Sequence, residues 1–162
     1  MRSLARFVKN NPWKRETLAA YYYSAYFRLE LLLVHPGCLM KRWGREGEES
    51  PETESEEHYR IAARISHIVN KVCDKTDWES KCLVRALTAQ RMLRKRQIPS
   101  TLYMGCGMRD GSLVAHAWLR CGELCVTGGD GSGYVIVDRF YMGGGEHRDV
   151  SHLGNCGPET VG

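Results

Sequence analysis

The sequence predicts an α+β protein in which helices come first and an antiparallel sheet follows. Apolar residues recur at helical spacing in three segments between residues 13 and 97, and none of these segments contains an interior glycine. From residue 101 onward, short runs rich in β-branched residues are separated by glycine-containing turns, a pattern typical of antiparallel strands. A chain of 162 residues that is 43% hydrophobic and 26% charged can bury one core and carry an appendage.

The first helix is predicted over residues 13–34, after Pro12 and before Pro36, because the segment is rich in tyrosine and leucine. Arg28 and Glu30 lie inside it, and two charged residues make a membrane-spanning role costly. The helix is therefore expected to pack on the domain. Its aromatic surface exceeds what packing alone needs, so a purely structural role and a role in docking a partner both stay open.

The chain divides into an N-terminal helical region (1–43), an acidic linker (44–57) and a main domain (58–162). The linker holds seven glutamates among Gly, Ser and Pro residues. Like charges with few apolar anchors predict a mobile segment whose last glutamates begin the next helix.

That next helix should cover the core with residues at helical spacing, namely Ile61, Ile65, Ile68, Val69 and Val72. His67 lies within it, and we interpret it as an exposed or hydrogen-bonded histidine rather than a catalytic one. A further helix carries Cys82 near its start and ends near Gln97, because Pro99 disfavours helix at the residue before it. Thr76 and Ser80 compete as its N-cap; Ser80 is preferred because it places the thiol in the first turn.

Four strands are predicted after this helix, and together they should form an antiparallel meander: residues 101–106, 113–120, 124–127 and 134–140. His116 lies on the second of them. If Val114 and Trp118 share its face, the imidazole stands beside an aromatic wall, while Ala115 and Ala117 permit close packing on the other face.

Cys82 and His116 form the candidate catalytic pair. A thiol at a helix N-terminus is favoured as thiolate, because unpaired N–H groups and the helix dipole stabilise negative charge there. An imidazole on a following strand can then exchange the proton, as in cysteine-nucleophile enzymes. The two residues are 34 positions apart, so the pairing requires the second strand to lie against the start of the Cys82 helix.

The surrounding sequence resembles a known family over residues 78–140. The resemblance rests on motifs in matching order: Trp78, Cys82-Leu83, Arg85-Ala86-Leu87, the segment from Gln97 to Gly105, and Ala115-His116-Ala117-Trp118. The segment resembles the B2 leader peptidases of lasso-peptide biosynthesis, which are members of the transglutaminase-like superfamily. It implies a transglutaminase-like or papain-like cysteine peptidase core, with an antiparallel sheet, that removes the leader of a ribosomally made precursor before the macrolactam forms.

The resemblance also implies partners and residue roles. The partners are the lasso precursor, a small B1-type protein that holds its leader, and an ATP-dependent macrolactam cyclase. A threonine near the end of the leader is expected to be a recognition element. Cys82 would be the nucleophile, and its backbone N–H, with the Trp78 indole, would stabilise the oxyanion. His116 would protonate the departing amine. No cofactor is expected.

The third catalytic member is where the sequence departs from the family. Many B2 proteins have an aspartate twelve residues after the histidine, and here that position is Gly128. Asp130, two residues later, is the leading candidate for orienting His116, and Asp138 is the second. A backbone carbonyl is the remaining alternative.

Other function classes are less favoured. An odd number of cysteines, seven, without a signal peptide predicts reduced thiols and a cytoplasmic protein. Cys121 and Cys125 do not form a Cys-x-x-Cys pair, so no metal site is predicted. The end of the Cys82 helix carries a basic cluster, which we interpret as a solvated helix end: Arg91, Arg94, Lys95 and Arg96. The sequence shows no element typical of nucleic-acid recognition. An acyl transferase using the same pair, and a non-catalytic leader-binding scaffold, stay open as alternatives.

Overall fold

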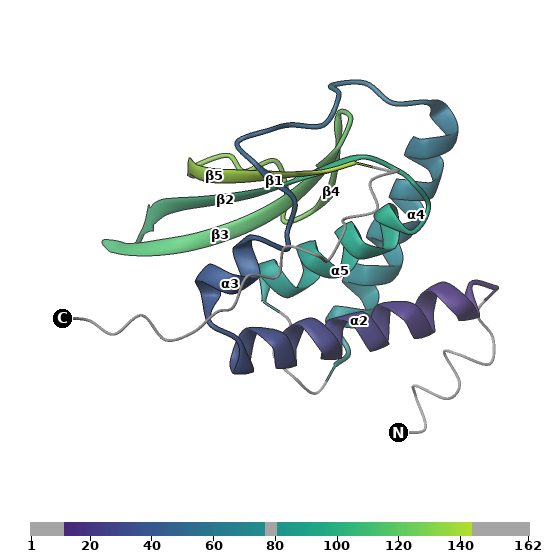
Figure 1. The fold of residues 1–162 in the computed structure, drawn as a ribbon, viewed down its shortest axis with the longest axis horizontal. Helices are drawn as coiled ribbons and strands as arrows, with labels where there is room; N and C mark the ends of the chain where they lie inside the picture. Colours follow the sequence, from purple (N-terminus) through teal and green to yellow (C-terminus); the bar gives the residue numbers. More distant parts are fainter. Residues whose placement is uncertain (1–11, 77–80, 144–162) are drawn as a thin grey trace.

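The computed structural model describes residues 12–76 and 81–143, and these form the α+β fold that the sequence predicts (Figure 1). A five-stranded sheet packs on two central helices, and a third helix covers the far side of that pair (Figure 1). The helices are α2 (Lys14–Leu33), α3 (Pro36–Met40), α4 (Glu56–Cys73) and α5 (Cys82–Arg94). The strands are β1 (Arg45–Glu46), β2 (Ser100–Arg109), β3 (Ser112–Cys121), β4 (Leu124–Thr127) and β5 (Val135–Met142). No helix in the described ranges is long and apolar enough to cross a membrane.

The sheet is antiparallel with the order β1-β5-β2-β3-β4, which corrects the predicted meander in one respect. Strands β2, β3 and β4 are sequential neighbours, but β5 crosses back to pair with β2 rather than with β4. The central position of β2 buries Leu102 between Leu119 of β3 and Phe140 of β5, all at most 1% exposed. Alternation in the sequence predicts which face a residue takes, but it does not determine which edge a strand joins.

The main core lies between the sheet and helices α4 and α5. Ile65, Val69 and Leu87 are buried here against Leu102 and Leu119. The apolar face predicted for α4 is confirmed, and His67 is exposed. Ser55 is the N-cap of α4, and its hydroxyl accepts a hydrogen bond from the His58 N–H at 3.2 Å.

Helix α2 has the predicted extent and forms the outermost layer. It buries Ala20 and Tyr23 against α4 and α5. Two members of the basic cluster lie over the Tyr23 ring, with Lys95 Nζ 5.2 Å and Arg91 Cζ 6.0 Å from its centroid. These cations therefore help to hold α2 on the domain in addition to contacting solvent.

The acidic segment differs from the expected mobile linker, because it packs across the outer face of the sheet. Ser50 is buried, and its N–H donates to Thr101 Oγ1 at 2.7 Å. The Glu49 carboxylate lies between two arginines of the sheet, 3.1 Å from Arg120 and 2.6 Å from Arg139. Repulsion among the glutamates can be recognised in the sequence, but the two arginines that oppose Glu49 are distant in sequence.

Glu49 gives this attachment a pH dependence. Burial raises the pKa of Glu49, but hydrogen bonds from Tyr103 and Arg139 and the charges of both arginines outweigh it, so the pKa is lowered. Stability from such a group is present above its unfolded pKa of about 4.3 and is lost as pH falls through the lower folded value.

We therefore expect Glu49→Gln to lower the melting temperature at pH 7, with a loss of up to about 1 kcal/mol for this half-exposed group. Its difference from the wild type should shrink as the pH falls below about 4. Glu48→Gln is the control, because Glu48 forms an ion pair with Arg45 in which both side chains are about half exposed. Thermal melts between pH 3 and pH 7 measure both, and an equal, pH-independent effect of the two substitutions would contradict this role of Glu49.

Candidate active site

Cys82 is the first residue of α5, so its predicted place in the first turn is confirmed. The N-cap is Lys81, which makes no capping hydrogen bond from its side chain, and the first turn contains no acidic residue. The first intrahelical bond runs from Arg85 N–H to Lys81 O at 3.1 Å, which leaves the earlier N–H groups without helical acceptors. Cys82 is a free, partly exposed thiol at the start of a helix.

His116 lies in the middle of β3, and its ring is held by a backbone carbonyl. Nε2 is 2.7 Å from Gly128 O. Since a carbonyl oxygen only accepts hydrogen bonds, Nε2 carries the hydrogen in this contact, and Nδ1 of the neutral ring is left to exchange a proton.

A column of aromatic rings fixes the plane of the imidazole. Tyr134 stacks on His116 with centroids 4.6 Å apart, and Trp118 stacks at 5.9 Å. Trp118 in turn stacks on Tyr103 at 5.4 Å. The stacking confirms that Trp118 shares the face of His116, while Ala117 points into the core on the other face.

The loop after β4 closes over this column and requires glycine at two positions. Gly128 has φ +79°, and a Cβ there would lie 2.5 Å from Ala117 O. A Cβ at Gly131 would lie 2.5 Å from the Trp118 ring. Glycine at position 128 thus lets the backbone approach β3 closely enough for its carbonyl to meet His116.

Neither candidate aspartate forms a hydrogen bond with His116 in the described part of the chain. Asp130 is exposed, and its Oδ1 accepts the Ser132 N–H at 2.9 Å, a bond that lowers the pKa of Asp130. Asp138 Oδ1 accepts the neighbouring Arg139 N–H at 2.7 Å. The geometry agrees with the backbone-carbonyl alternative, and catalytic roles for the two aspartates stay predictions.

The structure does not bring Cys82 and His116 together. Cys82 packs against the core cluster that contains Ala117, whereas His116, the neighbour of Ala117 on β3, points to the opposite face of the sheet. Both residues are described, and no hydrogen bond joins the thiol to the imidazole. Trp78, the predicted oxyanion residue, lies outside the described residues.

The other cysteines that the structure describes differ in burial and bonding. Burial, with the nearby charge of Glu54, raises the pKa of Cys121 to about 11, so this thiol is protonated at neutral pH. Cys73 is buried and Cys125 is exposed. Cys38 is disulfide-bonded, so the expectation that every cysteine is reduced fails at this position. Within the described ranges, no three His, Cys, Asp or Glu side chains gather in a way that could hold a metal ion.

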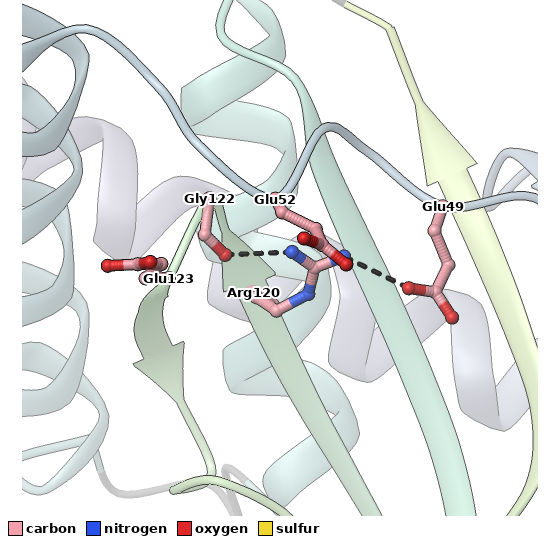
Figure 2. A pocket seen from close by; sticks show the side chains of 5 residues that line it. All are labelled: Glu49, Glu52, Arg120, Gly122 and Glu123. Atoms are coloured by element: carbon pink, nitrogen blue, oxygen red, sulfur yellow. Dashed lines mark hydrogen bonds and ion pairs between the residues drawn. The ribbon is translucent and has the colours of Figure 1, made fainter.

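A hollow of about 350 Å³ lies at the edge of the acidic segment, around Arg120 (Figure 2). The guanidinium is already occupied there, because it donates to Gly122 O at 2.8 Å, to Tyr103 Oη at 3.0 Å and to Glu49 at 3.1 Å. Figure 2 shows the Glu52 and Glu123 side chains around it. Arg120 therefore ties the acidic segment to the sheet and is not a free binding group.

Helices packed on an antiparallel sheet, with a free cysteine opening the central helix, define the class of transglutaminase-like and papain-like folds. The family model described as the transglutaminase-like superfamily matches residues 27–137, more than half of the chain. The chain therefore belongs to the transglutaminase-like superfamily. No curated protein and no protein of solved structure was found to match it.

Thiol labelling measures the reactivity of Cys82. We expect iodoacetamide at neutral pH to alkylate Cys82 faster than Cys125, because both thiols are accessible but only Cys82 opens a helix. Peptide mass spectrometry over a time course gives the two rates. Cys121 should stay unmodified in the folded chain. Equal rates at Cys82 and Cys125 would mean that the helix start does not activate the thiol.

Substitution of Gly128 tests how closely the loop after β4 approaches β3. We expect Gly128→Ala to destabilise the fold by about 1–3 kcal/mol, because the new Cβ meets Ala117 O and the left-handed backbone disfavours alanine. Gly129→Ala is the matched control: its φ is +74° but its Cβ would meet nothing within 4 Å. Denaturant unfolding compares the two variants, and a larger loss for Gly129→Ala would contradict the close approach.

Proposed function

We propose that this chain is a cysteine peptidase that cleaves the leader from a ribosomally made lasso-peptide precursor. Membership of the transglutaminase-like superfamily supports cysteine chemistry, and the free thiol of Cys82 at the start of α5 is the observation that carries the proposal. The narrower choice of leader cleavage rests on the resemblance of residues 78–140 to the B2 leader peptidases.

In the proposed reaction, the Cys82 thiolate attacks the carbonyl carbon at the junction of leader and core. The C–N bond breaks, the core leaves as an amine that takes a proton from His116, and the leader remains as a thioester on Cys82. Water then hydrolyses the thioester, which releases the leader carboxylate and regenerates the thiol. The N–H of Cys82 stabilises the oxyanion in both steps.

His116 would act through Nδ1, with Gly128 as a positioning residue. The Gly128 carbonyl holds Nε2–H, and stacking on Tyr134 fixes the ring plane, so the nitrogen that must exchange the proton is free. A neutral carbonyl orients the ring but supports the imidazolium less than a carboxylate does. We therefore expect slower turnover than in relatives with an aspartate at this position.

The proposal requires Cys82 and His116 to approach each other when substrate binds, because they lie on different faces of the sheet in the described structure. Leu113 of β3 is 72% exposed and Ala115 is also exposed, so this end of the strand is open to a bound peptide in the described part of the chain. Contacts with precursor bound along this end would offset the free-energy cost of the rearrangement.

The proposed partners are the precursor, a B1-type protein that presents the leader, and the cyclase that closes the macrolactam on the freed core N-terminus. They follow from the same resemblance. The exposed apolar end of the sheet, Met108 of β2 with Leu113 of β3 and Val135 of β5, offers an apolar surface for an extended peptide.

A second candidate function is a leader-binding scaffold without catalysis. The separation of Cys82 from His116 in the described structure favours it, since a scaffold needs neither contact nor proton exchange. An acyl transferase would use the same pair but would pass the leader to an amine. The three functions differ in their products and in their response to substitution of Cys82.

The test is precursor processing with the recognition protein present, followed by mass spectrometry. We expect wild-type chain to yield free leader acid and core, and Cys82→Ala and His116→Ala to lose about three orders of magnitude or more in rate while still binding the precursor. Asp130→Asn should have little effect, because its carboxylate faces solvent and Ser132.

Each other outcome identifies an alternative. Full processing by Cys82→Ala would exclude the peptidase, and binding without any processing by wild-type chain would favour the scaffold. A leader joined to an amine would favour the transferase. A loss of two to four orders of magnitude in Asp130→Asn would restore that residue as the orienting acid.

A further inference from the structure

Helix α2 covers α4 and α5 with one side and leaves its other side without a partner among the described residues. Its buried side contains Thr17, Ala20, Tyr23 and Ser24. The helix lies on the outside of the helical layer, away from the sheet (Figure 1). It is about equally apolar on all its faces, whereas a helix that packs on one side only normally has a polar outer face.

The outer side carries a row of large exposed apolar side chains: Leu18 (55%), Tyr22 (65%), Tyr26 (38%), Leu29 (57%), Leu32 (61%) and Leu33 (80%). Residues 18, 22, 25, 29 and 32 are separated by alternating steps of four and three. That is the spacing of the seam by which two helices of a coiled coil pack together. We call these five positions the α2 seam, and Ala25 is its central residue.

We propose that the α2 seam is a dimerisation surface, which pairs antiparallel with the α2 seam of a second copy of this chain. The seam is symmetric in size about its centre. An antiparallel two-fold places Ala25 against Ala25 of the second copy, Tyr22 against Leu29, and Leu18 against Leu32. Small residues thus meet at the crossing point, where the two backbones approach most closely, and large residues meet on either side.

The charges of α2 fit a second, antiparallel copy. Exposed Lys14 and Arg15 stand in the first turn, at the positive end of the helix dipole, and the last turn has no basic residue. Glu16, the acid of the first turn, is held by Arg96 at 3.1 Å. An antiparallel copy brings Lys14 and Arg15 to the negative end of its neighbour, whereas a parallel copy would place like charges side by side.

Beside the centre of the seam, the charge of Glu30 on α2 is already paired. Tyr26 Oη donates to the Glu30 carboxylate at 3.0 Å, and Arg42 forms an ion pair with the same carboxylate. These polar groups form a neutral rim beside the apolar row, as is usual at the edge of an interface.

Sedimentation equilibrium of the full chain tests the association. We expect wild-type chain to form dimers, and Leu29→Glu to weaken the dimer by about 100-fold or more, because each interface would bury two new charges. Met108→Glu is the matched control: it places the same charge at a residue 67% exposed on the sheet, and the dimer should persist. Monomeric wild-type chain, or equal weakening by both substitutions, would overturn the proposal.

Cysteine cross-linking tests the antiparallel geometry. Ala25→Cys should form a disulfide-linked dimer on mild oxidation, because residue 25 faces itself across the two-fold. Leu18→Cys alone should not, whereas a mixture of Leu18→Cys and Leu32→Cys chains should. The wild-type chain, oxidised in parallel, gives the background from its own cysteines. Cross-linking of Leu18→Cys to itself at the rate of Ala25→Cys would contradict the antiparallel pairing.

Discussion

Strand β3 packs against a different layer on each of its two faces, and the rest of the structure depends on which of its residues lie on which face. Ala117, Leu119 and Cys121 face α4 and α5 and form the centre of the main core. Trp118 and Arg120, which alternate with them, face the other side. A shift of one residue would exchange these two sets, expose the core residues and bury a guanidinium, so the register is strongly determined.

The outer face of the sheet is covered by two segments that are largely irregular, although the first of them includes β1. The acidic segment is fastened at Ser50 and Glu49, and the glycine-rich loop after β4 closes over Trp118 and His116. Each segment supplies a polar partner that the sheet itself does not offer. The Glu49 carboxylate pairs with the two arginines, and the Gly128 carbonyl accepts a hydrogen bond from His116. The histidine is therefore oriented by the same covering that completes the fold.

Much of this arrangement could be predicted from the sequence, because it depends on periodicity and on local signals. The extents of α2 and α4, the place of Cys82 in the first turn of α5 and the shared face of His116 and Trp118 all follow from spacing and strand alternation. The pairing of β5 with β2 and the docking of the acidic segment could not be predicted, since both depend on partners distant in sequence.

The candidate site shows the same limit. An acidic side chain near position 128 can be recognised in the sequence, whereas the backbone carbonyl that contacts His116 has no sequence signature of its own. The signal that could have found it is the glycine itself: a residue without a side chain permits a close backbone approach. The side of the sheet on which His116 stands, relative to Cys82, required the three-dimensional structure.

The central claim is that Cys82 forms a covalent bond with the leader. It is tested most directly by mixing the chain with precursor and recognition protein, quenching in acid within the first turnover, and mapping adducts by mass spectrometry. We expect a leader thioester on the peptide that contains Cys82, which disappears as free leader acid accumulates. Release of leader without any such adduct, together with unchanged release by Cys82→Ala, would contradict it.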